Sequence, residues 1–244
     1  MRLKLDSPKI LSDIITIISE LVTEVKLRIT NEGVSLTAVD PANVAMAYFK
    51  LPSDLFSEFN LEQDQILGIN LDNLKSVLKR CKPGSSLTLE KNQDENKLHL
   101  GIIDRIKRDF SLSLIDIASE DKEMPEWEFD SVIKIDTTAL TEAIEDCLVV
   151  SDACSFTAEP NKFIIQAAGL HSAKTEFSSD EAEIVSGNSS SRYSLEYLSK
   201  FIKGAKIASH AHLNFSKDHP LRINFPTGNV MLSFVLAPRI EQDD

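Results

Sequence analysis

Two clusters of Lys and Arg have a spacing suited to contact with phosphate groups. They lie in residues 71–84 and 195–208 and comprise Lys75, Lys79, Arg80 and Lys82, then Lys200, Lys203 and Lys206. The two stretches hold seven cations and two acids, a net charge of +5, so the remainder of this −12 chain carries −17. A local positive surface on a negative body can hold phosphates in one place and repel them elsewhere. The alternative is a pair of solvated helix faces without a ligand.

The elements that position these cations are predicted to be two matching amphipathic helices. In the first stretch the apolar residues recur at helical spacing, as do those of the second: Leu71, Leu74, Val77, Leu78 and Cys81, then Leu195, Leu198, Phe201, Ile202 and Ala205. Residues three and four apart share one helix face. We therefore expect each helix to pack one face and to expose its cations on the other.

Residues that could support catalysis do not form a recognisable constellation. His210 and His212 would share one face of a strand, but no carboxylate or Cys lies at metal-ligand spacing, and no glycine-rich phosphate loop is present. The acids Glu142, Glu145 and Asp146 are interpreted as a solvated helix face. His99, His171 and His219 are interpreted as isolated. We expect no catalytic residue, metal or cofactor and no enzyme, with a hydrolase or metal enzyme using His210 and His212 as the rival.

Composition indicates an ordinary globular protein. Of its 244 residues 42% are hydrophobic and 26% charged, and no apolar run is long enough to span a membrane. The N-terminus lacks the apolar segment of a secretory signal, which predicts an intracellular location. Cys81, Cys147 and Cys154 are odd in number and lie in apolar patterns, so they are expected to be buried thiols.

The two halves of the chain repeat each other. A shift of 129 residues places Leu11 on Leu140 and Ile15 on Ile144, and a shift of 124 places Leu74 on Leu198. Each half is predicted to contain antiparallel strands and about two helices, an α+β fold. The acidic stretch 118–129, which holds the single Trp, is predicted to connect domain 1–117 to domain 130–244.

Two strands suggest assembly with other chains. Residues 109–117 and 172–178 alternate small polar with apolar residues, as exposed edge strands do. If one edge meets the other edge of a neighbouring chain, the contact is head-to-tail and can close a ring. The predicted interface residues are Phe110, Leu112, Leu114, Ala173, Thr175 and Phe177. The alternative is that both strands pair within one chain.

Five segments of the chain together resemble the DNA sliding clamp family PCNA, especially its archaeal forms. They are LTAVDPANVAM (residues 36–46), GINLDNLKSVLKR (68–80), FSLSLID (110–116), the connector MPEWEF (124–129) and the ending FVLAPRIEQDD (234–244). The resemblance covers essentially the full length. It implies a three-subunit ring of six domains, with antiparallel sheets outside and helices lining a hole around duplex DNA.

The function implied by the resemblance is that of a processivity factor, which tethers enzymes to DNA without reading its bases. Lys79 and Lys203 match family positions near DNA, and helical spacing adds Lys75, Arg80, Lys82, Lys200 and Lys206. The implied partners are duplex DNA and, through short peptides, DNA polymerase, flap nuclease, ligase and a clamp loader powered by ATP. The implied peptide pocket comprises Val39, Val44, Met46, Met124, Pro125, Pro220, Val235, Leu236, Ala237 and Pro238.

The sequence also departs from the family. Ser19, Ser76, Glu142 and Glu145 occupy helix positions where many clamps carry Lys or Arg, and helix 137–149 carries −3. This leaves open a homotrimer, a dedicated subunit of a heterotrimeric or checkpoint-type clamp whose paralogues supply the missing charge, or a peptide-binding scaffold that does not touch DNA. The expected location is the cytoplasm, at the nucleoid, for an archaeal protein and the nucleus for a eukaryotic one.

Overall fold

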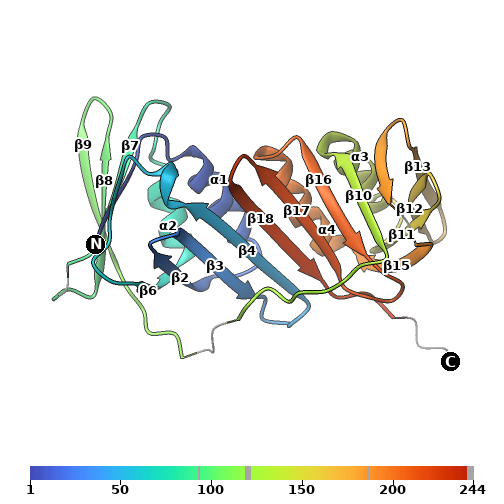
Figure 1. Cartoon of the computed structure of the whole chain (residues 1–244), viewed down its shortest axis with the longest axis horizontal. Coiled ribbons are helices and arrows are strands. Elements are labelled where there is room, and N and C mark those ends of the chain that lie inside the picture. Colours follow the sequence, from blue (N-terminus) through green and yellow to red (C-terminus); the bar gives the residue numbers. More distant parts are fainter. Residues whose placement is uncertain (93, 119–121, 186, 241–244) are drawn as a thin grey trace. The chain divides into compact units, whose positions relative to one another are not determined.

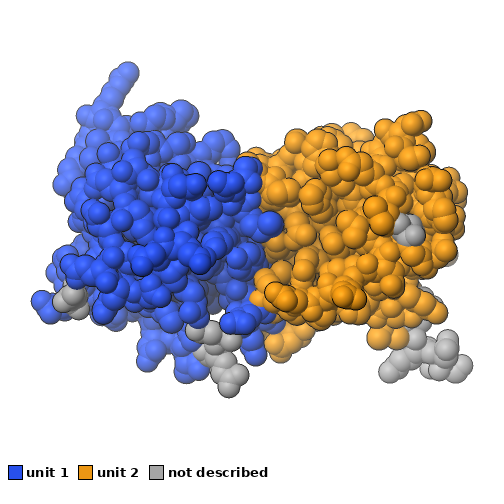
Figure 2. Space-filling view, viewed as in Figure 1, with its two compact units in different colours: residues 1–39, 47–123, 228–231 blue, residues 40–46, 124–227, 232–244 orange. Residues whose placement is uncertain are grey.

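The chain forms two compact units, each with antiparallel strands and α-helices. A computed structural model describes residues 1–92, 94–118, 122–185 and 187–240 (Figure 1). Figure 2 colours unit 1, residues 1–39, 47–123 and 228–231, and unit 2, residues 40–46, 124–227 and 232–244. The predicted α+β class and its duplication are confirmed. The connector positions 119–121 and the terminal residues 241–244 of the predicted motifs lie outside the described residues.

Unit 1 contains α1 (Lys9–Ile18) and α2 (Leu71–Leu78), which pack against each other. One set of its strands follows the order β5 (Glu58–Asn60), β1 (Arg2–Leu5), β7 (Ser86–Glu90), β8 (Lys97–Ile103) and β9 (Lys107–Ser113). A second set follows the order β4 (Ala45–Pro52), of which residues 47–52 belong to this unit, β3 (Gly33–Val39), β2 (Glu24–Thr30) and β6 (Gln65–Asn70). A short 3-10 turn, η1 (Ser53–Leu55), follows β4.

Unit 2 repeats this plan with α3 (Thr137–Leu148) and α4 (Leu195–Phe201), the latter continued by the 3-10 helix η2 (Ile202–Lys206). One strand order is β14 (Ala182–Val185), β10 (Ser131–Asp136), β16 (His210–Phe215), β17 (Leu221–Thr227) and β18 (Val230–Leu236). The other is β13 (Ser172–Ser178), β12 (Lys162–Ala168), β11 (Ala153–Glu159) and β15 (Ser189–Ser194).

The cores of the two units use equivalent residues. Leu11 and Leu140 are buried on α1 and α3, and Leu74 and Leu198 on α2 and α4. Unit 2 adds an aromatic cluster in which the rings of Phe156, Phe163 and Phe215 lie 5.6–6.1 Å apart. The apolar periodicity therefore predicted the inward faces correctly.

The basic helices are shorter than predicted, and their last cations lie outside the regular helix. Asn70 caps α2 by accepting a 3.1 Å hydrogen bond from the Asn73 amide, and the helix ends at Leu78 in a turn that leads to Pro83 and Gly84. Lys79, Arg80 and Lys82 consequently follow α2. In unit 2, Lys203 and Lys206 lie in η2.

Gly204 lets η2 approach the sheet closely. A Cβ at this position would come within 2.5 Å of the Phe225 ring on β17. Only a residue without a side chain fits there without displacing the ring. Gly204 therefore allows η2, which carries Lys203 and Lys206, to pack closely against β17.

Both predicted edge strands lie at the end of their described strand order. β9 pairs with β8 and β13 pairs with β12, and neither has a second hydrogen-bonded neighbour among the described strands. Exposed and less exposed side chains alternate along both strands. Each strand thus has one row of backbone groups available for another chain.

The three cysteines are free thiols. Cys147 and Cys154 are buried as predicted, whereas Cys81, three residues after the end of α2, is only half-buried. Within the described residues, no helix has the combination of length and apolar character that a bilayer crossing would demand.

Candidate nucleic-acid interface and peptide-binding surface

The cations of unit 1 divide into one that supports the fold and three that face solvent. Lys75 donates hydrogen bonds to Asp72 Oδ1 at 2.8 Å and to Ser19 Oγ at 3.0 Å, which ties α2 to the end of α1, and its side chain is 22% exposed. Lys79, Arg80 and Lys82 are exposed. The Arg80 carbonyl accepts a 3.0 Å hydrogen bond from Arg108 Nη1 on β9, so this positive turn lies beside the edge strand.

In unit 2 the first cation is also held by neighbours. Lys200 donates to Glu196 Oε1 at 3.1 Å and lies 5.1 Å from the centroid of the Tyr197 ring. Lys203 is half-buried and Lys206 is exposed. The exposed cations therefore lie after the regular helices, which the sequence pattern did not indicate.

The α3 helix presents the predicted acidic face. Glu142, Glu145 and Asp146 are all exposed, while Leu140, Ala143 and Ile144 are buried. Asp136 caps the helix by accepting from the amides of Thr138 at 2.8 Å and Ala139 at 3.2 Å. The negative charge thus belongs to a regular, well-capped helix whose apolar face packs on the sheet.

The predicted peptide-pocket residues of unit 2 gather around one end of β17 and β18. Pro220 precedes β17 and Ala237 follows β18, and the Ala237 amide donates a 2.9 Å hydrogen bond to the Val44 carbonyl. We call the half-buried members the apolar patch: Val44, Met46, Met124, Pro125, Pro220, Ala237 and Pro238. Val39, half-buried at the end of β3, belongs to unit 1.

Two predicted pocket residues do not reach the surface. Leu236 is 0% exposed and Val235 is 7% exposed. They are consecutive residues at the end of β18, so their side chains point to opposite faces of the strand, and both are covered. The expectation that they form open pocket walls is therefore corrected, because both side chains are buried.

A buried carboxylate, which sequence reasoning missed, fixes the loop that carries Val44 and Met46. Asp40 is 6% exposed and accepts hydrogen bonds from the amides of Val44 at 2.7 Å, Ala45 at 2.7 Å and Ala42 at 3.2 Å. The Tyr197 hydroxyl on α4 donates a fourth, at 2.7 Å. Only the AspProAla turn at residues 40–42 could have signalled a local cap.

The electrostatics of this site follow from its hydrogen bonds. Burial works to raise the pKa of Asp40, but the four donors outweigh burial and lower the pKa below its ordinary value. The hydrogen bond to the Asp40 carboxylate, together with burial, raises the pKa of Tyr197 to about 12. The pair therefore holds an anion and a neutral phenol at neutral pH.

Two histidines interpreted as isolated have partners. His99 Nδ1 lies 2.9 Å from Ser111 Oγ, its cross-strand neighbour, and His99 Nε2 contacts Glu95. This Glu–His–Ser row lies on the open sheet surface, where His99 is 34% and Glu95 47% exposed. His219 packs edge-on against Trp127, with ring centroids 5.0 Å apart. In the described chain no three His, Cys, Asp or Glu side chains converge as metal ligands, and His210 instead lies 3.0 Å from Ser209 Oγ.

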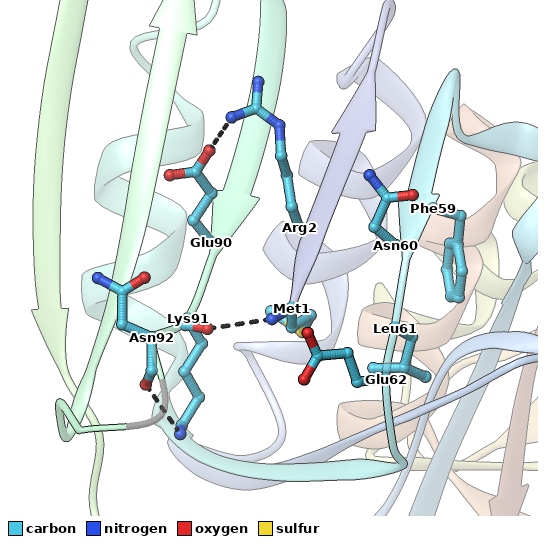
Figure 3. A pocket seen from close by; sticks show the side chains of 9 residues that line it. All are labelled: Met1, Arg2, Phe59, Asn60, Leu61, Glu62, Glu90, Lys91 and Asn92. Atoms are coloured by element: carbon cyan, nitrogen blue, oxygen red, sulfur yellow. Dashed lines mark hydrogen bonds and ion pairs between the residues drawn. The ribbon is translucent and has the colours of Figure 1, made fainter.

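Unit 1 also has an open hollow of about 560 Å³ at its N-terminus (Figure 3). The Met1 ammonium donates a 3.1 Å hydrogen bond to the Lys91 carbonyl there, and Arg2 pairs with Glu90 (Figure 3). Mixed polar and apolar side chains line the hollow, and the two contacts hold the N-terminal residues in place there.

Comparison with known proteins gives one consistent result. The chain matches the family described as proliferating cell nuclear antigen, with the N-terminal domain over residues 1–123 and the C-terminal domain over residues 123–240. It is 34% identical over 242 residues to the DNA polymerase sliding clamp of Thermococcus onnurineus, covering 97% of each chain. It is 32% identical over 247 residues to that of Nanoarchaeum equitans, covering 98% of this chain and 99% of the other.

A solved structure shares the same fold. The crystal structure of the proliferating cellular nuclear antigen from Entamoeba histolytica superposes with a TM-score of 0.92 at 21% identity and covers 98% of both chains. Two duplicated α+β domains with basic helices and free edge strands define a clamp-type protein. The chain belongs to the proliferating cell nuclear antigen family, and its function is that of a sliding clamp and not of an enzyme.

Proposed function

We propose that three copies of this chain close into a ring around duplex DNA and tether DNA polymerase to its template. The observation that carries this proposal is the match of both clamp domains over residues 1–240, combined with a free edge strand in each unit. Head-to-tail contact of β9 with the β13 of a neighbour closes a ring when the rotation fits. Of the predicted interface residues, those proposed to meet the neighbour are half-buried: Phe110, Leu112, Ala173 and Thr175. The other two are corrected, because Leu114, which follows β9, is 8% exposed and Phe177 is 6% exposed, so neither side chain is open to a neighbour.

The DNA contact is assigned to the cations that follow α2 and α4. All seven cations are proposed to attract phosphates: Lys79, Arg80, Lys82 and Lys206 from exposed positions, and Lys75, Lys200 and Lys203 from half-buried ones. Contacts with the phosphate backbone carry no sequence information, which suits a protein that slides. The acidic face of α3 makes the ring lining uneven in charge, so that the DNA is attracted mainly by α2, α4 and η2.

The apolar patch is proposed as the docking site for peptides of client enzymes. A patch of half-buried apolar side chains, with the exposed acids Glu126 and Glu128 following Pro125, suits a peptide with aliphatic and aromatic anchors and flanking cations. Tethering acts by raising the effective concentration of the enzyme at its template. We propose DNA polymerase, flap nuclease, ligase and an ATP-driven clamp loader as clients, inside the cell at the nucleoid or in the nucleus.

The ring is tested by light scattering after size exclusion across a dilution series. A species near three times 27.1 kDa is expected. A persistent monomer or dimer would contradict the homotrimer and would redirect the search to a mixed ring with paralogues.

The DNA contact is tested by a double charge reversal, Lys79→Glu with Lys203→Glu. Binding to linear duplex should weaken, and its logarithmic salt slope should fall by about 0.9 for each phosphate that is no longer neutralised. The matched control is Lys97→Glu with Lys217→Glu, which reverses one exposed cation in each unit for the same change in charge. Equal weakening in both double variants would assign the effect to net charge and would contradict the proposed surface.

A further inference from the structure

The second half of the connector lies on unit 2 as an alternating strip. Met124, Pro125, Trp127 and Phe129 are half-buried, whereas Glu126 and Glu128 are exposed. From Pro125 to Phe129 the exposure alternates with period 2, which is what an extended segment shows when one side rests on a sheet. The segment is anchored beyond Phe129 as well, because the Asp130 amide donates a 2.9 Å hydrogen bond to Ser216 Oγ.

One side chain contacts the strip at three places. Arg222, the second residue of β17, donates from Nη2 to the Pro125 carbonyl. Its Cζ lies 5.8 Å from the centroid of Trp127 and 5.4 Å from that of Phe129, within the range of a cation–π contact. His219 closes the group, with its ring edge-on to both aromatic rings at 5.0 and 5.6 Å.

The cost of placing Arg222 there indicates that the contact matters. Its Nε atom is buried and has no hydrogen-bond partner in the described part of the chain. Burial lowers the pKa of Arg222, and the Glu126 carboxylate partly opposes this. A buried guanidinium donor without a partner is unfavourable, so the contacts with Pro125, Trp127 and Phe129 must offset that cost.

We infer that Arg222 is the positioning residue of the apolar patch, because it clamps residues 125–129 in the extended form that receives a partner peptide. The inference rests on the proposed docking function of that patch. A connector that is already ordered spares the peptide the entropy of ordering it, which raises affinity without any direct contact between Arg222 and the peptide.

The test uses the only Trp of the chain as a reporter. In Arg222→Met the fluorescence emission of Trp127 should shift to the red, and its indole ring should become more accessible to the quencher acrylamide. The dissociation constant of a synthetic peptide with one aliphatic and two aromatic anchors should rise about tenfold, mainly through faster release. Arg222→Lys keeps the charge but lacks the planar fork, so it should lie between the wild type and Arg222→Met.

The matched control is Lys217→Met, which removes the same charge at an exposed position of the turn between β16 and β17, five residues before Arg222. It should leave both the emission and the affinity unchanged. Unaltered Trp127 emission in Arg222→Met and Arg222→Lys would overturn the clamp, as would unaltered peptide affinity. If the wild type fails to bind the peptide but Arg222→Met still shifts the emission, the clamp stands and the docking function of the patch fails.

Discussion

Removal of the Asp40 carboxylate should release the loop that carries Val44 and Met46. In Asp40→Ala the amides of Val44 and Ala45 lack the acceptor that they reach at 2.7 Å, and the Tyr197 hydroxyl lacks its 2.7 Å partner. Hydrogen bonds to a charged group contribute about 1.5–3 kcal/mol each, but the loop can partly rehydrate. We therefore expect the local stability to fall by about 4 kcal/mol, counted as two such bonds.

Milder variants grade the effect. Tyr197→Phe removes one donor and leaves the three amides in place, so it should cost about 1.5–2 kcal/mol. Asp40→Asn keeps an acceptor for Val44 and Ala45 but removes the charge, which should cost a similar amount. The assay is native-state hydrogen exchange of the Val44 and Ala45 amides, which reports the local opening free energy without assuming that both units unfold together. Each 1.4 kcal/mol corresponds to about tenfold faster exchange.

At acidic pH the difference in local stability between the wild type and Asp40→Asn should become smaller. The pKa of Asp40 is lowered in the folded protein, so the stabilisation that its charge provides is fully present above the ordinary Asp pKa of about 3.9 and is lost as pH falls through the lower folded pKa. The difference between wild type and Asp40→Asn should stay constant above about pH 5 and narrow below about pH 4. A difference that is absent at pH 7, or that does not narrow in acid, would refute this account of the loop.

Two further pairs of variants test the assembly and the patch. Leu112→Asp on β9 should convert the trimer to smaller species in light scattering, whereas Ser113→Asp, on the opposite face of the same strand, should affect it less; equal effects would argue against Leu112 as an interface residue. Leu236→Ala should destabilise unit 2 by about 2–5 kcal/mol because the side chain is fully buried. Met124→Ala should change the free energy of unfolding by less than about 1 kcal/mol but should weaken peptide binding by about 1–3 kcal/mol, as measured by calorimetry. The reverse pattern would contradict the assignment of Met124 to the peptide surface and of Leu236 to the core.

The local periodicities of the sequence determined the elements and their duplication. Apolar spacing of three and four residues identified α2 and α4, and period-2 alternation identified β9 and β13 as edge strands. The resemblance carried by segments such as residues 36–46 and 124–129 identified the family, which the comparisons confirmed. These features were readable because neighbouring residues in the sequence specify helix faces and strand faces directly.

The tertiary structure alone decided which candidate side chains are available and what holds the sites in place. Helical spacing predicts that Lys75 is a surface cation, but in the structure it donates a hydrogen bond to Ser19, 56 residues away, and so stabilises the packing of α2 on α1. Leu236 matched the family's pocket yet points into the core. The Asp40–Tyr197 bond spans 157 residues and the Arg222–Pro125 bond 97. Such pairs depend on how distant segments pack, and periodicity within one segment carries no information about the partner that a side chain meets across the core.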